Sequence, residues 1–181
     1  NGTVQVTCRD GSLYKAKKVI VALAPTLYDK LSWKPELPLS KLMLSKSMSM
    51  GHIIKTYMYY ETAWWRDRGL NGQIWDIDGP VLYSIDDCKP GEKYPALMGF
   101  CLADDAKKWG EKTPAERKQA ITQQYQDLFQ CEEATKPVGY VELDWNAEEF
   151  SGGGPVASPD LGSFLETSKH IREPFGNVHF G

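Results

Sequence analysis

The sequence predicts an α/β (α+β) fold in which a mixed sheet covered by helices forms one domain, and a hairpin with a buried strand belongs to another. Three observations predict it. Residues 51–60 are rich in β-branched and aromatic types after a glycine, as in a strand. Three further apolar segments follow at 73–75, 81–85 and 96–102 without long crossovers. Residues 114–129 have the start signals and the periodicity of a helix.

Composition narrows the class of protein. The 181 residues are 41% hydrophobic and 25% charged, with a net charge of −3, which is ordinary for a globular chain with one large core or two small ones. The mildly acidic net charge gives no sign of a basic surface that would bind nucleic acid or an anionic membrane. No apolar run approaches the roughly 20 residues of a membrane helix. The four cysteines are far apart, so we expect free thiols and no metal site: Cys8, Cys88, Cys101 and Cys131.

The first fifty residues predict a small β structure followed by a segment without regular structure. Segments 4–8 and 13–16 flank a turn and form a hairpin. The apolar run 19–23 suits a strand buried on both faces, and a short helix at 26–31 follows Pro25. The two prolines of 33–38 exclude regular structure there. A weak helical period runs from 39 to 50.

The strand at 51–60 contains one residue that does not fit its neighbours. Its alternating faces are both largely apolar, so we expect the strand to be covered on both sides. Lys55 is then either a buried ammonium that needs a partner, or a lysine whose stem lies on apolar surface while its head reaches water. The segments that follow it, with a turn at 76–80, suggest an antiparallel or mixed sheet.

The second half begins with the clearest element. Thr113 is a natural N-cap, Pro114 fits the first helical position, and Glu116 completes a capping box. One side of the helix should be apolar, formed by Ile121, Tyr125, Leu128 and Phe129. A strand at 138–143 follows. The end of the chain, 178–181, reads as a strand that is cut off, so we expect the chain to be a piece of a longer protein.

Simple catalytic motifs do not explain the sequence. There is no Gly-x-Gly-x-x-Gly after the first strand, no phosphate-binding loop and no helical histidine pair. His52, His170 and His179 have no metal or triad spacing. The pairs Asp86-Asp87 and Asp104-Asp105 are typical of solvated or capping loop residues rather than of acid–base catalysts.

Four stretches together carry a family resemblance. Residues 51–65, Tyr83-Ser84-Ile85-Asp86-Asp87, Met98-Gly99-Phe100, and Trp145 with 148–153 resemble the flavin-containing monoamine oxidases in order and spacing over nearly the whole chain. The resemblance implies that Lys55 holds a water against the flavin N5 and is the catalytic candidate. It also implies cofactor contacts from Trp145, Ser151, Gly152, Gly153 and Gly154, and a substrate cavity lined by Tyr83, Phe100 and Trp75.

The chain departs from this family at two positions. Where the family has a cysteine that bonds covalently to the flavin, this chain has Gly154, and where it has a cage tyrosine, this chain has Pro155. Glycine offers no thiol and proline no phenol, so the resemblance implies FAD bound without a covalent link. The other half of the aromatic cage would lie beyond Gly181.

The resemblance also implies domains and a function. Residues 1–34 would belong to an FAD-binding domain, 35–150 to an amine-substrate domain, and 151–181 would return to the first. The full-length protein would oxidise an amine to an imine, reduce FAD and release hydrogen peroxide, while the fragment alone is expected to be inactive. One alternative is a non-catalytic binding module that retained the fold, and another is a bare structural domain without a ligand.

Partners and compartment follow from the same resemblance. The expected partners are a small-molecule amine and molecular oxygen, with no nucleic acid, and a homodimer is an arrangement that the resemblance allows. A true monoamine oxidase would lie at the mitochondrial outer membrane; otherwise we expect an intracellular protein.

Overall fold

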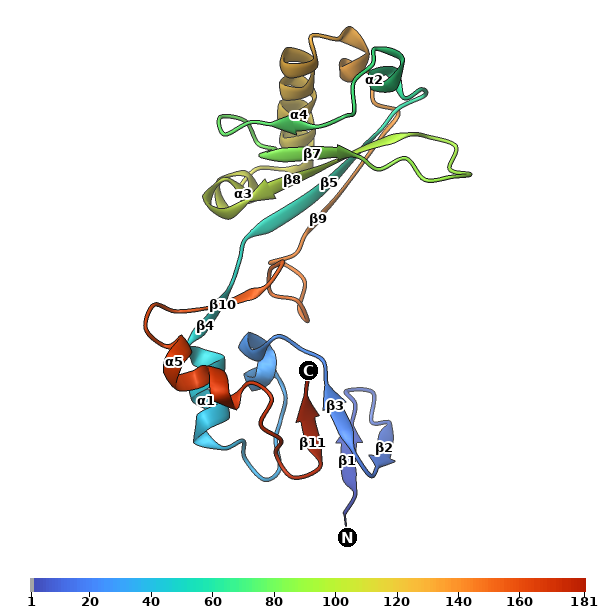
Figure 1. Ribbon diagram of the computed structural model, residues 1–181. Helices are drawn as coiled ribbons and strands as arrows, with labels where there is room; N and C mark the ends of the chain where they lie inside the picture. Colours follow the sequence, from blue (N-terminus) through green and yellow to red (C-terminus); the bar gives the residue numbers. More distant parts are fainter. Residues whose placement is uncertain (1) are drawn as a thin grey trace. The chain divides into compact units, whose positions relative to one another are not determined.

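The computed structural model describes residues 2–181, and these divide into two compact units (Figure 1). One unit contains residues up to Met50 together with Glu149–Gly181, and the other is Gly51–Glu148. The first division lies at residue 50 rather than at the predicted 34, because the helix and strand after the proline segment pack against the first unit. The second division lies at 148, two residues from the predicted 150. The functions assigned to the units stay predictions.

The unit Gly51–Glu148 is built on a five-stranded sheet. Its strand order is β6-β7-β8-β5-β9, and every neighbouring pair is antiparallel. The strands are β5 (Ile53–Tyr59), β6 (Ile74–Trp75), β7 (Tyr83–Asp86), β8 (Ala96–Leu102) and β9 (Gly139–Asp144). The α/β (α+β) class is confirmed, but the predicted mixed sheet is wrong for this unit, because the sheet is antiparallel throughout. The reason is topological: the helical crossover joins β8 to β9, which are not neighbours, because β5 lies between them.

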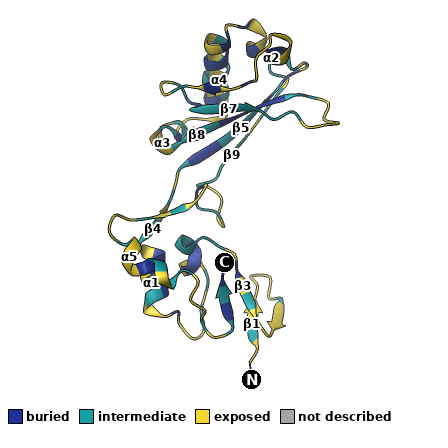
Figure 2. Cartoon of the chain, in the orientation of Figure 1, coloured by how far each residue is buried: buried dark blue, intermediate teal, exposed yellow. Residues whose placement is uncertain are grey.

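Helices cover one face of this sheet. They are α2 (Trp64–Asp67), α3 (Ala103–Gly110), α4 (Pro114–Phe129) and the 3₁₀ turn η2 (Glu132–Thr135). Ile54 and Met58 of β5 and Leu97 of β8 are fully buried beneath them. Figure 2 shows buried segments in dark blue on the strands of this sheet and on α4. The helices cover one face of β5, while on the other face Ile53 is buried and Lys55, Tyr57 and Tyr59 are half-buried, so cover on both faces stays a prediction.

The helix α4 confirms its sequence signals. Thr113 and Glu116 form the capping box, and the helix ends at Gln130 in the left-handed conformation. Ile121, Tyr125 and Phe129 are buried as predicted, but Leu128 is 45% exposed. The helical turn puts Leu128 almost in line with the buried Ile121, so its exposure goes with its place in the last turn of the helix and not with its side of the helix.

The other unit contains three two-stranded sheets. The predicted hairpin is β1 (Val4–Thr7) with β2 (Leu13–Ala16), β3 (Val19–Val21) pairs in parallel with β11 (Val178–Phe180), and β4 (Met48–Met50) pairs with β10 (Ala157–Pro159). Helical segments are η1 (Pro25–Lys30), α1 (Leu39–Lys46), α5 (Phe164–Thr167) and η3 (Ser168–His170). The prediction that β3 is buried on both faces is wrong at Ile20, which is 73% exposed, because Val19 and Val21 on the other face are the residues of β3 that pack in the core of this unit.

The core of this unit forms around Tyr28, Leu44 and Phe180. The buried Lys41 of α1 holds the end of η3 in place, because its Nζ donates to the carbonyls of His170 and Ile171. The same ammonium lies 3.7 Å from the ring centroid of Phe180, a cation–π contact that ties α1 to β11.

Candidate functional site

One row of side chains crosses all five strands of the sheet on the face that the helices leave open. Residues opposite each other in antiparallel strands project to the same face. Lys55 on β5 pairs with Phe100 on β8, Phe100 with Tyr83 on β7, and Tyr83 with Trp75 on β6. On the other side Lys55 pairs with Leu143 of β9. The row therefore brings together Lys55 and all three predicted cavity residues.

The aromatic rings of the row form a nearly continuous apolar floor. The ring centroids of Trp75 and Tyr83 are 4.6 Å apart with a tilt of 39°. Those of Tyr83 and Phe100 are 6.2 Å apart and nearly parallel, at 10°. Trp75 is 73% exposed within the chain, and Tyr83 and Phe100 are half-buried. Aromatic rings that are exposed in this way make this face a candidate binding surface.

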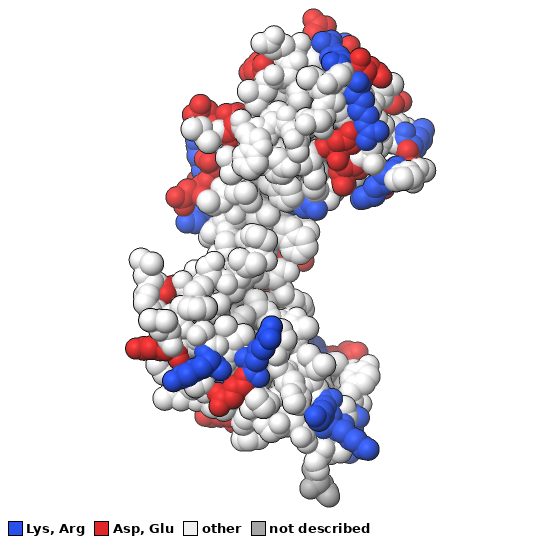
Figure 3. Space-filling view, viewed as in Figure 1, with Lys and Arg blue, Asp and Glu red and all other residues white. Residues whose placement is uncertain are grey.

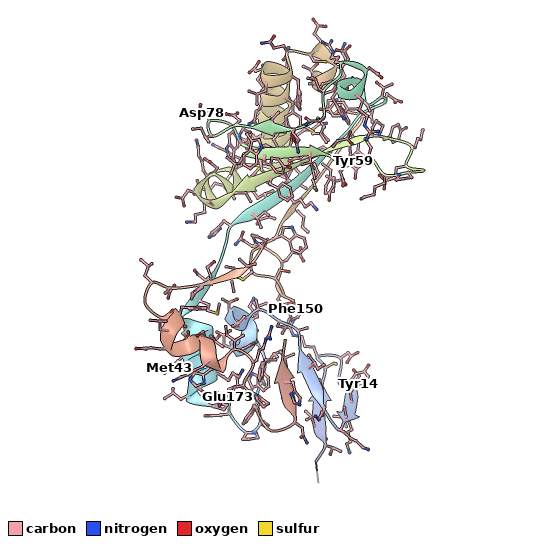
Figure 4. All side chains as sticks on the ribbon, viewed as in Figure 1. Tyr14, Met43, Tyr59, Asp78, Phe150 and Glu173 are labelled. Atoms are coloured by element: carbon pink, nitrogen blue, oxygen red, sulfur yellow. The ribbon has the colours of Figure 1, made fainter. Side chains whose placement is uncertain are left out.

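Lys55 lies at the end of this floor between two rings. Its Nζ is 5.7 Å from the centroid of Phe100 and 5.2 Å from that of Tyr57, two residues along β5. Tyr57 is in turn stacked on Tyr59, the residue labelled at the end of the strand in Figure 4. Among the described residues, no oxygen accepts a hydrogen bond from Lys55 Nζ. The ammonium thus has aromatic neighbours and three unused donors.

The open face is free of acidic side chains over its strands. By register, its members are Ile53, Lys55, Tyr57, Tyr59, Trp75, Tyr83, Ile85, Ala96, Met98, Phe100, Leu102, Gly139, Val141 and Leu143. The carboxylates of β7 and β9, Asp86, Glu142 and Asp144, lie on the opposite face. Lys55 is therefore the single charged group among these positions. Figure 3 shows that acidic and basic side chains elsewhere on the visible surface are interspersed.

The opposite face fixes the floor from below. Arg117 of α4 donates from Nε to Glu142 of β9 at 2.8 Å, and its Nη1 donates to the carbonyl of Trp109 at 2.8 Å. Tyr140 donates its hydroxyl to the same carboxylate. Burial alone would raise the pKa of Glu142, but the hydrogen bonds from Arg117 and Tyr140 hold that pKa below its ordinary value. This network joins the α3–α4 connection to the edge strand of the floor.

Gly99 lets α4 approach the floor closely. It lies between Met98 and Phe100 on β8, and its missing side chain leaves room for Tyr125. A Cβ atom there would lie 2.8 Å from Tyr125 Oη, 2.9 Å from Thr56 Oγ1 and 3.0 Å from a methyl of Val81. The Met98-Gly99-Phe100 triplet therefore combines one helix contact, at Gly99, with two residues of the open face.

Trp145 follows β9 by one residue. Its backbone N–H donates to the carbonyl of Ile53 at 3.1 Å, which extends the pairing of β9 with β5. The strand alternation that carries Lys55 and Ile53 thus continues to Trp145, which is half-buried. Asn146 holds the strand end, because its Oδ1 accepts from the N–H of Ile53 and its Nδ2 donates to the carbonyl of Gly51.

The predicted glycine stretch belongs to the other unit. Gly152 and Gly153 have φ of 63° and 133°, which favour glycine, so the residue type is required by the backbone. Gly153 and Gly154 are buried, and Ser151 is half-buried. Gly154 and Pro155 offer neither thiol nor phenol, as the sequence indicates.

The remaining candidates have structural partners. Asp86 accepts hydrogen bonds from Trp65 Nε1 at 2.8 Å and from Arg66, which ties α2 to β7. The prediction that Asp104 and Asp105 lie in a loop is wrong: they occupy the first turn of α3, where carboxylates complement the helix dipole. No cluster of three or more metal-ligating side chains occurs in the described part of the chain. Among residues 2–181, no helix combines the length and apolar character that crossing a bilayer requires.

Sequence reasoning missed two parts of the site. Leu143 completes the surroundings of Lys55, but its pairing depends on the register of β9 with β5, which residue types alone do not give. Gln124, which holds the turn between β6 and β7, resembles any polar residue of an amphipathic helix. The sequence feature that could have indicated Gln124 is its position directly before Tyr125, a residue predicted to face the core.

Comparisons with known proteins agree with the resemblance in the sequence. The sequence profile of the family "Flavin containing amine oxidoreductase" matches residues 1–181. A flavin-containing amine oxidase of Danio rerio is 38% identical over 179 residues, covering 98% of this chain and 34% of the relative. The flavin-containing amine oxidase A of Canis lupus familiaris is 38% identical over 170 residues, covering 93% of this chain and 32% of the relative. The chain thus spans about a third of the length of these curated relatives.

Solved structures show the same fold. Putrescine oxidase bound to putrescine matches with a TM-score of 0.90 and 30% identity, over 99% of this chain and 40% of that protein. The cyclohexylamine oxidase of Brevibacterium oxydans matches with a TM-score of 0.89 and 26% identity, over the same shares.

Proposed function

The chain belongs to the flavin-containing amine oxidoreductase family, and we propose that it is part of a longer protein that oxidises an amine to an imine. In this proposal the amine would lose two electrons and two protons on becoming the imine; bound FAD would supply the redox chemistry, and oxygen would be reduced to hydrogen peroxide. The observation that carries the proposal is the row across the sheet: an ammonium at the end of a floor of aromatic rings, with no acceptor among residues 2–181.

The residues of the open face fit a flavin and an apolar substrate. A tricyclic ring system needs flat apolar surface, which the aromatic rings supply. Lys55 can donate a hydrogen bond to a water or a ring nitrogen, and the aromatic neighbours exclude other waters from it. When bound, the flavin supplies the redox chemistry, and the chain contributes position, a dry surface and a fixed donor. Trp145 stays a candidate for contact with the edge of the flavin ring.

In the other unit, the stretch from Ser151 to Gly154 is the candidate for a close backbone approach to the cofactor. The positive φ of Gly152 and Gly153 supports this proposal, because a backbone without Cβ atoms can lie directly against a ligand. Since Gly154 has no thiol, we expect the FAD to be held without a covalent bond at this position.

The open face favours a monoamine with an apolar body. A diamine such as putrescine carries a second ammonium, which would need a carboxylate or a polar cage after losing its hydration. By register the face offers no acidic side chain over its strands, and its charged member, Lys55, would repel a second cation. An arylalkyl or cycloalkyl amine needs none of these groups.

The test is peroxide release by the full-length protein with phenethylamine, cyclohexylamine and putrescine. We expect kcat/KM for the two apolar amines to be at least about tenfold above that for putrescine. A site that leaves the second ammonium of putrescine unpaired can discriminate against it to this extent. A preference for putrescine would contradict the substrate class. Bound FAD without turnover of any amine would favour the alternative of a non-catalytic binding module. The proline at position 155, where the family has a cage tyrosine, supports that alternative.

A further inference from the structure

A buried glutamine on α4 holds the turn between β6 and β7 by three hydrogen bonds. Gln124 is 7% exposed, and its Oε1 accepts from the N–H of Val81 at 3.0 Å. Its Nε2 donates to the carbonyl of Val81 at 2.8 Å and to Asp76 Oδ2 at 2.6 Å. Both amide hydrogens and the carbonyl oxygen are therefore used, so the side chain acts towards Val81 as a neighbouring strand would.

The turn is shaped to receive this side chain. Asp76 Oδ1 accepts the N–H of Asp78, the residue labelled at this turn in Figure 4. Gly79 leaves the space that the glutamine fills, because a Cβ there would lie 2.2 Å from Gln124 Nε2. Asp76 forms no ion pair within the described chain, so the amide is its side-chain partner.

The turn determines where the far end of the aromatic floor lies. Trp75 directly precedes Asp76, and Tyr83 follows Val81 by two residues, so the clamped segment joins the two rings that stack at 4.6 Å. Because β6 has only two residues and lies at the edge of the sheet, its own ladder bonds are few. The position of Trp75 then depends on the clamp beside it.

We propose that Gln124 is a positioning residue that sets the amine specificity of the open face by fixing Trp75 and Tyr83 through the 76–81 turn. The proposal rests on the proposed amine oxidase function and deepens it. It also explains why an amide is required: a carboxylate at 124 would face the carboxylate of Asp76 and the carbonyl of Val81, whereas an apolar side chain would leave all three groups without a partner.

The experiment uses the full-length protein and the variants Gln124→Glu and Gln124→Met. We expect KM for phenethylamine to rise about tenfold, with kcat changed less than about twofold, because binding geometry and not the reacting atoms is altered. Hydrogen exchange at the Val81 amide should accelerate in both variants. In Gln124→Glu, the second change Asp76→Asn should partly restore KM and exchange protection, because an asparagine amide can donate to the new carboxylate.

Gln123→Glu is the matched control. Gln123 is the exposed neighbour on the same helix, and its Nε2 donates to Asp127 at 2.9 Å, so the same change of charge should leave KM and Val81 exchange unaltered. Faster exchange at Val81 with an unchanged KM would overturn the specificity role, and unchanged exchange would overturn the clamp itself. If the unsubstituted protein oxidises no amine, the proposed function fails and the specificity role fails with it, while exchange at Val81 still decides whether Gln124 holds the turn.

Discussion

Replacing Gly99 by alanine tests whether α4 presses directly on the back of the aromatic floor. The new Cβ atom would lie 2.8 Å from Tyr125 Oη, 2.9 Å from Thr56 Oγ1 and 3.0 Å from Val81 Cγ2. All three neighbours are completely buried, and the ring of Tyr125 and the branched side chain of Thr56 are stiff. The strain therefore has to move β8 or α4.

The expected cost lies at the upper end of the overpacking range. One extra carbon in a well-packed core typically costs about 1–3 kcal/mol, and three simultaneous contacts at or below 3.0 Å place Gly99→Ala at about 2–3 kcal/mol of unfolding free energy. Because Phe100 is the next residue, displacement of β8 should also raise KM for apolar amines. Urea unfolding of the full-length protein, followed by tryptophan fluorescence, measures the first effect.

Gly110→Ala is the control. A Cβ there would meet its nearest atoms at 3.9 Å and 4.0 Å, ordinary contact distances, at the exposed end of α3. It should stabilise by about 0.4–1 kcal/mol, because alanine restricts the unfolded chain. A loss below about 0.5 kcal/mol for Gly99→Ala, the level of a neutral surface change, would refute the packing argument.

Three further predictions follow, two on the buried ion pair and one on the cofactor. Arg117→Met should cost about 3–5 kcal/mol of unfolding free energy, because Glu142 would stay buried without its partner. The pKa of Glu142 is lowered in the folded state, so its contribution to stability is present above the carboxyl's unfolded pKa and lost as pH falls through the folded one. Urea midpoints between pH 7 and pH 3 should thus fall more in the unsubstituted protein than in Glu142→Gln, and parallel curves would contradict this. The FAD should separate from the acid-denatured protein on a desalting column, because Gly154 has no thiol to bond it. The double variant Gly154→Cys with Pro155→Tyr should keep part of its FAD in the same experiment. FAD retained by the unsubstituted protein would show that another residue is linked to it.

The sequence predicted those helices and strands well whose formation depends on interactions between residues close in the chain. The capping box at Thr113 and the strand at 96–102 both occur as expected, because caps and alternating apolar residues depend on near neighbours. The division at Met50 was not predicted, because the prolines at 35 and 38 break regular structure without ending a packed unit. Nothing within the α1 sequence says against which unit it packs.

The candidate site shows the same limit. Residue types and the family resemblance singled out Lys55, Tyr83, Phe100 and Trp75, but their alignment in one row depends on the register of four strands. The alternation of residues along β5 predicts two apolar faces and does not show which of them the helices cover. The helices α3 and α4 decide which of them is covered, and that is a property of packing between distant segments.

The most direct test of the central claim is the rate of flavin reduction and reoxidation in the full-length Lys55→Met variant. If Lys55 acts on a water or a ring nitrogen of the cofactor and does not anchor it, flavin content should stay nearly intact. At least one half-reaction should lose about 2–4 kcal/mol of transition-state stabilisation, roughly a 30- to 1000-fold slowing. Methionine keeps the apolar stem over Phe100 and Tyr57, so the change removes mainly the charge. Unchanged rates in both half-reactions would contradict the account and make Lys55 a strand lysine whose stem lies on aromatic rings and whose head reaches water.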